Sequence, residues 1–258
     1  MDLNLTGKNA LVCGSTQGIG LASAQELALL GANVTLLARN EVKLNAAVSS
    51  LDNSQNQTHS ILVADFSDNT QVQQIASANN EFHILVNNTG GPPAGKAVDA
   101  DITEFTTAFS AHLINNQLLA QAITPFMVSE GYGRIINIIS TSVKMPLNGL
   151  GVSNTIRGAV ASWSKTLANE LGCFGITVNN VLPGATNTVR LSSIIENKSK
   201  KLGKTVEEVS NAMKAEVPAK RFAEANEVGA AVAFLASPAA GYINGINVPV
   251  DGGRTGCL

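Results

Sequence analysis

The sequence predicts a single α/β domain built on a doubly wound parallel sheet, and three observations support this prediction. Short apolar runs alternate with helical patterns along nearly the whole chain. Runs that are apolar throughout, such as Ala10–Cys13, are typical of parallel strands that are covered on both faces. A glycine-rich turn separates the first strand from the first helix. We therefore expect about seven strands with helices on both faces of the sheet.

The order of the elements follows from the apolar pattern and its period. Seven strands are expected, at Ala10–Cys13, Asn33–Ala38, Ser60–Asp65, His83–Asn87, Arg134–Ile139, Thr177–Leu182 and Ile246–Val250. Helices are expected directly after Gly20 and at Glu41–Leu51, Thr70–Ala78, about Thr103–Val128, about Val152–Leu171 and Asn226–Leu235. Polar, lysine-rich sequence fills residues 190–220. We find no repeat and no linker, and we treat residues 1–258 as one domain.

Composition excludes several classes of protein. The 258 residues are 45% hydrophobic and 14% charged, which favours a globular domain over a disordered chain. The net charge is −2 and no basic run is present, so we expect neither nucleic acid nor a membrane surface as a partner. No apolar run approaches the length of a membrane span, and no export signal is visible. Isolated histidines and scattered cysteines predict no metal site and a reduced, cytoplasmic protein.

The glycine-rich turn predicts a nucleotide site. Gly14, Gly18 and Gly20 form a G-x-x-x-G-x-G pattern between a buried strand and a helix. Glycines let the backbone turn sharply and approach a phosphate, which the free N–H groups of the helix start then bind. A purely structural turn is the alternative. The predicted cofactor-binding residues of this turn are Gly14, Ser15, Thr16, Gln17, Gly18, Ile19 and Gly20.

Two further strand ends carry residues suited to the adenosine part of a dinucleotide. Arg39 follows the second strand, where a cation favours the 2′-phosphate of NADP(H) over the ribose hydroxyl of NAD(H). Asp65, with Phe66 beside it, ends the third strand, where a carboxylate can meet the adenine amino group. The alternatives are a surface arginine that flanks a helix and an aspartate that caps the next turn.

The ends of the fourth and sixth strands are expected to border the rest of the cofactor. Asn88, Thr89 and Gly90 let the backbone approach a ribose, and Pro183–Gly184 is a rigid turn that can form a wall of the nicotinamide pocket. Thr186 and Thr188 lie behind that turn. Each of these segments by itself could be an ordinary loop.

Taken with these residues, the chain resembles a short-chain dehydrogenase/reductase over nearly its whole length, and most of all the 3-oxoacyl-acyl-carrier-protein reductase-like members. The matching stretches are the Gly14–Gly20 turn, Asp65, NNTG at 87–90, GRIINIIS at 133–140, ITVNNVLPG at 176–184 and VDGG at 250–253. The resemblance implies a Rossmann-type sheet of order 3-2-1-4-5-6-7 and a substrate lid at about 186–222. It also implies oxidoreduction of a small carbonyl/alcohol substrate, and a homotetramer or homodimer formed through two long helices.

The catalytic pattern of that family is only partly present. The family has a serine, a tyrosine thirteen positions later, a lysine four positions after that, and an asparagine in the preceding helix. In this chain Ser140 matches the serine, whereas Ser153, Arg157 and His112 occupy the other three positions. Cys13 also replaces the usual threonine before the first glycine. The spacing is kept while three of the four side chains differ.

These replacements leave the source of the proton open. A serine hydroxyl is much less acidic than the family's tyrosine, so Ser153 is a poor acid unless it relays a proton. Arg157 can supply positive charge and hold the nicotinamide ribose but cannot donate a proton near neutrality. Lys144, if buried beside Arg157, would have a lowered pKa, and His112 has an ordinary pKa of about 6.5. Each of these residues also has a structural interpretation. Lys144 could be an exposed loop lysine, His112 a structural helix histidine, and Ser140 a turn serine.

Three functions are compatible with the sequence. The first is a divergent NADP(H)-dependent oxidoreductase that interconverts a carbonyl and an alcohol. The second is a catalytically impaired NADP(H)-binding sensor or regulatory protein. The third is a cofactor-assisted epimerase or eliminase. The polar lid at about 186–222 does not identify the substrate.

Overall fold

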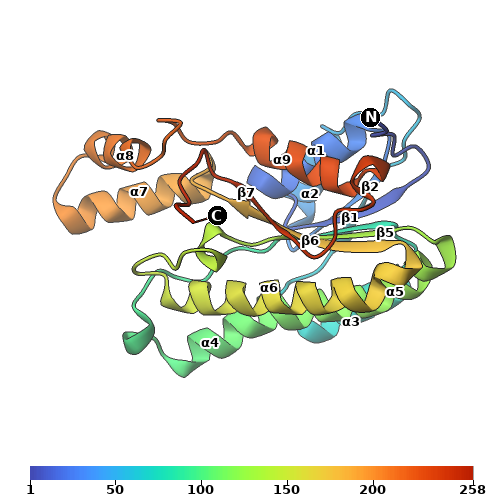
Figure 1. Cartoon of the computed structure of the whole chain (residues 1–258), viewed down its shortest axis with the longest axis horizontal. Coiled ribbons are helices and arrows are strands. Elements are labelled where there is room, and N and C mark those ends of the chain that lie inside the picture. Colours follow the sequence, from blue (N-terminus) through green and yellow to red (C-terminus); the bar gives the residue numbers. More distant parts are fainter. Residues whose placement is uncertain (258) are drawn as a thin grey trace.

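The computed structural model describes residues 1–257 and contains a seven-stranded parallel sheet (Figure 1). The strand order is β3-β2-β1-β4-β5-β6-β7, so the predicted fold class and strand order are confirmed. The strands are β1 Asn9–Cys13, β2 Asn33–Ala38, β3 Ser60–Val63, β4 Ile84–Asn87, β5 Gly133–Ile138, β6 Ile176–Pro183 and β7 Asn247–Val250. Because the chain moves from β3 back across β1 to β4, the two halves of the sheet meet between β1 and β4.

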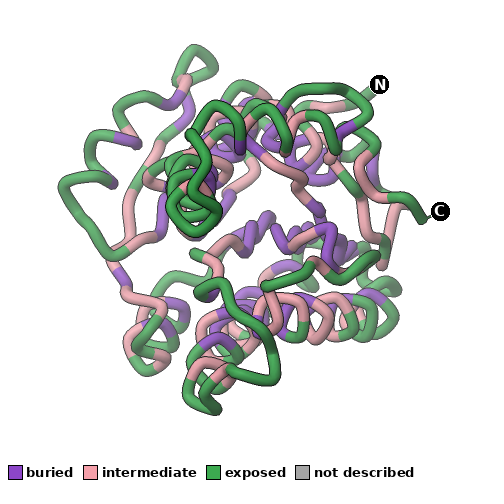
Figure 2. The backbone as a smooth tube through the Cα atoms, turned by 90° about the vertical axis from the view of Figure 1, so that its left-hand side faces the viewer, coloured by how far each residue is buried: buried purple, intermediate pink, exposed green. Residues whose placement is uncertain are grey.

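Helices cover both faces of this sheet (Figure 1). One layer holds α1 Gly18–Leu29, α2 Glu41–Val48 and α9 Ala225–Ala236, and the other holds α3 Asn69–Ala78, α4 Ile102–Phe109, α5 Asn115–Glu130 and α6 Gly151–Leu171. The buried backbone is concentrated in the sheet between the two layers (Figure 2). The short 3-10 helices are η1 Ala97–Asp99, η3 Thr141–Val143, η4 Gly172–Phe174 and η5 Pro238–Ala240.

The alternation of side chains along β1 shows why the strands are apolar throughout. Ala10 and Val12 pack into the core beneath α1 and α9, whereas Leu11 and Cys13 pack into the core beneath α3, α5 and α6. Successive side chains of a strand point to opposite faces, so both sets must be apolar when both faces are covered. Burial raises the pKa of the Cys13 thiol to about 12, which makes this cysteine a neutral core residue.

The prediction of one long helix over about Thr103–Val128 is wrong at its centre. A π-helical segment, η2 Ser110–Ile114, separates α4 from α5. Polar side chains at both ends of η2 bind the neighbouring loop: the Ser110 hydroxyl donates to Asn69 at 2.5 Å, and Asn115 donates to the Phe66 carbonyl at 2.7 Å. Such π segments interrupt the regular ladder and are frequent at functional sites. Apolar periodicity alone does not reveal them.

The polar segment that we predicted as a lid contains two helices, α7 Val189–Leu202 and α8 Val206–Ala215. They form an arm beside the main body of the domain (Figure 1). Thr205 and Glu208 form a capping box that begins α8, while Gly203, with a φ of +63°, ends α7. A small core of Leu191, Ile195, Val209 and Phe222 holds the arm together.

A row of asparagines crosses four neighbouring strands. Asn87, Asn137, Asn180 and Asn247 are register partners on β4, β5, β6 and β7. Their side-chain amides are linked in sequence by hydrogen bonds of 2.8 Å, 3.1 Å and 2.8 Å. Ser164 of α6 joins the row at Asn137 and Asn180, at 2.8 Å and 2.7 Å. We call these residues the asparagine ladder, and it ties together the strands that end at the candidate site.

Among residues 1–257, no helix has both the length and the apolar character needed to cross a membrane.

Candidate active site

The glycine-rich turn lies at the carboxyl end of β1, where the two halves of the sheet meet. Gly14 has a φ of +58°, and a Cβ atom there would lie 2.5 Å from the Asn88 carbonyl oxygen. A Cβ atom at Gly20 would collide with the Gly14 carbonyl. Asn88 holds this turn by donating its side-chain amide to the Cys13 and Gly14 carbonyls, at 3.3 Å and 3.1 Å. The backbone geometry therefore requires glycine at these two positions.

This turn has the features of a phosphate-binding cradle. Gln17, the N-cap residue of α1, makes no side-chain capping bond, so the N–H groups that begin α1 remain available. The hydroxyl of Ser15 is fully buried and, among residues 1–257, has no hydrogen-bond partner. A Cβ atom at Gly18 would lie 3.2 Å from Thr188 Cγ2, so the loop after β6 passes close to the turn. These observations fit a dinucleotide whose pyrophosphate lies here.

Arg39 and Asp65 lie beside each other at the ends of β2 and β3. The Arg39 Nη1 atom is 3.8 Å from Asp65 Oδ2, and the two side chains are 78% and 41% exposed. Hydrogen bonds from the Ser67 amide and hydroxyl, and less strongly the charge of Arg39, hold the pKa of Asp65 below its ordinary value. Asp65 therefore also caps its turn, as the alternative interpretation states. Phe66 presents its carbonyl to Asn115.

Ser140 and Arg157 are held together by the end of β5. Ser140 is half-buried at the start of η3, and its oxygen accepts a hydrogen bond from the Ser142 N–H at 3.1 Å. Arg157 is 8% exposed and donates from Nη1 to the Ile138 carbonyl at 2.9 Å. Ser153 is half-buried one helical turn before Arg157 on α6. Ser140 and Arg157 thus both lie at the carboxyl end of β5, and α6 carries Ser153 on the same side as Arg157.

His112 lies in η2 and contacts Thr89, with His112 Nδ1 and Thr89 Oγ1 within hydrogen-bond distance. The side chain is 2% exposed. Burial, followed by the positive charges of Arg157 and Arg190, lowers the pKa of His112 to about 3, although a hydrogen bond to the Gly90 backbone acts in the opposite direction. His112 is therefore neutral at physiological pH.

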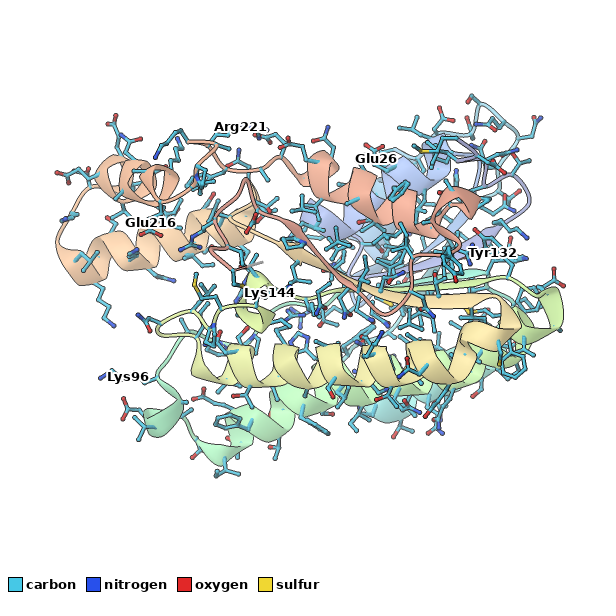
Figure 3. The ribbon with its side chains drawn as sticks, viewed as in Figure 1. Glu26, Lys96, Tyr132, Lys144, Glu216 and Arg221 are labelled. Carbon is cyan, nitrogen blue, oxygen red and sulfur yellow. The ribbon has the colours of Figure 1, made fainter. Side chains whose placement is uncertain are left out.

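Lys144 directly follows η3 and is exposed. This exposure agrees with the alternative of an exposed loop lysine and not with burial beside Arg157. Figure 3 shows Lys144 close to the C-terminal coil, and the Cys257 thiol lies 3.7 Å from the Lys144 carbonyl oxygen.

The loop after β6 packs between the end of β7 and the glycine-rich turn. A Cβ atom at Gly184 would lie 2.8 Å from the Cα atom of Asp251, so Gly184 allows this close approach. Thr186 is buried and donates to the Gly184 carbonyl at 3.2 Å. Thr188 caps α7 by accepting from the Leu191 N–H at 3.3 Å. Pro183 is the last residue of β6.

Arg190 is a site residue that the sequence reasoning missed. It lies in the first turn of α7, and its Nη2 atom donates to the Pro92 carbonyl at 3.0 Å. Its guanidinium packs against Gly91, where a Cβ atom would lie 2.9 Å from Nη2. The charge of Arg190 lowers the pKa values of both His112 and Arg157. The signal in the sequence is an arginine two positions after Thr188, at the start of the polar segment.

The segments that follow the carboxyl ends of β1 to β6 include the glycine-rich turn, Arg39, Asp65, Asn88–Gly90 and Gly184, and doubly wound sheets bind ligands at this edge. Among residues 1–257, no group of three or more His, Cys, Asp or Glu side chains is arranged to hold a metal ion. A glycine-rich cradle before a helix, at the point where the two halves of the sheet meet, is the arrangement of a dinucleotide-binding α/β protein.

Comparison with known proteins gives the family. The chain belongs to the short-chain dehydrogenase/reductase family, since a family model described as enoyl-(acyl carrier protein) reductase matches residues 14–255. A chloroplastic tropinone reductase homologue of Arabidopsis thaliana is 34% identical over 257 residues, covering 98% of this chain and 77% of that protein. Gluconate 5-dehydrogenase of Gluconobacter oxydans is 28% identical over 256 residues, covering 98% and 96%.

Solved structures agree with this family. The crystal structure of L-sorbose reductase from Gluconobacter frateurii, complexed with NADPH and L-sorbose, superposes with a TM-score of 0.93. It is 30% identical to this chain, and the match covers 100% of both chains.

Proposed function

We propose that this protein is an NADP(H)-dependent oxidoreductase that interconverts a small carbonyl compound and its alcohol. The observation that carries the proposal is the placement of Ser140 and the buried Arg157 at the end of β5, next to the cradle formed by Gly14 and Gly20. Family membership supports oxidoreductase chemistry. The sorbose reductase that shares this fold is complexed with NADPH and a sugar substrate, which supports both the cofactor and the class of substrate.

The cofactor is held by two groups of residues in this proposal. The turn from Gly14 to Gly20, with the Ser15 hydroxyl, receives the pyrophosphate at the start of α1. Arg39 turns from Asp65 toward the 2′-phosphate, which the long 3.8 Å ion pair and the exposure of the guanidinium permit. The ribose and nicotinamide lie against Asn88–Gly90, Pro183–Gly184, Thr186 and Thr188.

NADP(H) supplies or accepts the hydride when it is bound, and the chain's residues handle the oxygen and the proton. The Ser140 oxygen accepts from the Ser142 N–H, and in this proposal its O–H donates to the substrate oxygen. Arg157 is fixed by the Ile138 carbonyl, and its positive charge stabilises negative charge that develops on that oxygen. Burial and the charge of Arg190 lower the pKa of Arg157 to about 10, so the guanidinium is still charged at neutral pH.

The proton reaches the oxygen through Ser153 and water in this proposal. Ser153 stands one turn from Arg157, and a neighbouring positive charge favours a serine hydroxyl that transiently loses its proton. His112, neutral and bonded to Thr89, acts as a positioning residue. Lys144, exposed at the rim, is the second candidate donor.

A catalytically impaired NADP(H)-binding protein is the second candidate function. The specific observation that favours it is the absence of a tyrosine at position 153, where the family has its acid. The binding cradle does not depend on that residue. Two further parts of the proposal are a homotetramer or homodimer, which the resemblance implies, and a cytoplasmic location, which the scattered cysteines favour.

Oxidation of NADPH in the presence of a panel of small ketones, sugars and 3-oxo acids distinguishes these functions. The oxidoreductase proposal predicts substrate-dependent loss of NADPH and formation of an alcohol. Tight NADPH binding without turnover across the panel would favour the sensor, and product formation without net cofactor turnover would favour an epimerase or eliminase. With a substrate in hand, Ser153→Ala and Lys144→Met separate the two proton routes: the variant with the larger loss of turnover, by roughly 10²–10⁴-fold, identifies the donor.

A further inference from the structure

Two arginines whose charges act on each other lie at the candidate active site, and no described ion pair engages them. Arg157 is nine-tenths buried and uses Nη1 for the Ile138 carbonyl. Arg190 is exposed and uses Nη2 for the Pro92 carbonyl. The ion pairs formed by residues 1–257 engage Arg39, His83, Arg221 and Arg254, and neither Arg157 nor Arg190 is among them. Both guanidiniums therefore keep donors that no described carboxylate satisfies.

The cost of this arrangement indicates that it serves a ligand. A buried cation without a counter-charge is unfavourable, and a second cation nearby increases that cost. The effect is visible in the pKa of Arg157, which burial and the charge of Arg190 lower to about 10, and in the neutral state of His112. Proteins retain such an unfavourable arrangement of charges at functional sites, where a ligand of opposite charge stabilises it. A planar guanidinium matches the two oxygens of an oxyanion.

The positions of the two arginines suggest which oxyanion the ligand carries. Arg157 is attached to the strand that ends at Ser140, which in the proposed function contacts the substrate oxygen. Arg190 reaches from the arm to the loop after β4, where Gly91 provides the space that its guanidinium occupies. The pyrophosphate cradle at Ser15 and the start of α1 is a separate group of donors.

We propose that Arg190, together with Arg157, binds a carboxylate carried by the carbonyl substrate, so that the substrate is a small oxo acid. This inference rests on the proposed function, because it uses the same site. The alternative source of the oxyanion is the cofactor's own pyrophosphate.

Calorimetric titration of the NADP⁺ complex tests this proposal without turnover, since oxidised cofactor cannot reduce a ketone. The probes are acetoacetate and its neutral methyl ester. A charge-assisted bond predicts that the acid binds at least about 10-fold more tightly than the ester. Arg190→Gln should reduce this ratio to near one, and Arg190→Lys should retain part of it. Lys198→Gln, which removes one exposed charge from the same helix, should leave the ratio unchanged.

The cofactor titration separates the two sources of the oxyanion. The proposal expects the dissociation constant of NADP⁺ to change by less than about 2-fold in Arg190→Gln. A large loss of NADP⁺ affinity with an unchanged acid-to-ester ratio would assign Arg190 to the cofactor and overturn the proposal. Equal binding of acid and ester, or no binding of the acid, by the parent protein would also overturn it. If NADP⁺ binds to no variant, the proposed function fails, and the acid-to-ester ratio of the free protein still tests the arginine pair.

Discussion

The ends of β1 to β3 and the ends of β4 to β6 form two halves of one site that differ in how they are determined. In the first half, Gly14 and Gly20 are required by backbone conformation and close contact, and no other residue type fits. In the second half, α6 carries Ser153 and Arg157, which in the proposed function stand where the family has its tyrosine and lysine. Packing thus fixes the glycine-rich half, which we call the cofactor half, whereas the proposal assigns altered side chains to an unchanged scaffold in the other, the catalytic half.

The two halves also differ in electrostatics. The exposed Arg39 has a carboxylate neighbour, Asp65. The buried Arg157 has instead a second arginine and a histidine that stays neutral. The catalytic half is therefore an unbalanced positive site, and the asparagine ladder, which begins at Asn87 next to Asn88, links it to the glycine-rich turn.

The largest expected effect comes from closing the cofactor cradle. Gly14→Ala places a Cβ atom 2.5 Å from the Asn88 carbonyl at a φ of +58°, so the turn has to move. We expect NADPH affinity to fall at least about 100-fold, equivalent to about 2.7 kcal/mol. Gly7→Ala is the control, because Gly7 has a φ of +78° but open space around it. Fluorescence titration measures the NADPH affinity of both variants. Equal, small losses of affinity would show that contact with Asn88 does not shape the cradle.

The next largest effect concerns the ladder between the two halves. Asn137→Ala removes partners from Asn87, Asn180 and Ser164, all of which are buried. Unsatisfied buried groups cost about 1–3 kcal/mol, so we expect the free energy of unfolding to fall by about 2–3 kcal/mol. Asn247→Ala, at the half-buried end of the ladder, should cost less. Urea unfolding measures the free energy of unfolding of both variants. A larger decrease for Asn247→Ala than for Asn137→Ala would contradict this prediction.

A smaller effect is expected at the adenosine end of the cofactor half. Arg39→Ala removes a charge-assisted contact with the 2′-phosphate, which should weaken NADP(H) binding by about 1.5–3 kcal/mol. Affinity for NAD(H), which lacks that phosphate, should hardly change. Parallel titrations with both cofactors measure the difference. An unaltered preference would remove Arg39 from the site.

The smallest effect is a pH dependence of stability in the catalytic half. The pKa of His112 is about 3 in the folded chain and about 6.5 when unfolded, so below pH 6.5 the unfolded state binds more protons. Stability from this group is present above pH 6.5 and is lost as the pH falls toward 3. In His112→Asn, the decrease between pH 7 and pH 5 should be smaller by about 1–2 kcal/mol. Urea unfolding at both pH values measures it; an identical decrease in both proteins would exclude a neutral buried His112.

The features that follow from backbone physics could be predicted from the sequence. Apolar runs predicted the strands within a few residues, and the glycine spacing located the cradle. Three features could not be predicted in this way. The π segment around His112 depends on side-chain bonds from Ser110 and Asn115 to a distant loop. The low pKa of His112 and the effect of the Arg190 charge on it depend on which charges the fold brings together.

Deuterium transfer from 4-deuterated NADPH tests most directly the claim that an intact cofactor half serves a catalytic half with altered side chains. With an oxo-acid or ketone substrate found in the panel, the account predicts deuterium on the carbinol carbon of the product. It also predicts a transfer rate at least about 10²-fold lower in Ser140→Ala, with NADPH affinity nearly unchanged. Tight binding of NADPH without transfer of deuterium to any carbonyl compound of the panel, or full transfer by Ser140→Ala, would contradict the account.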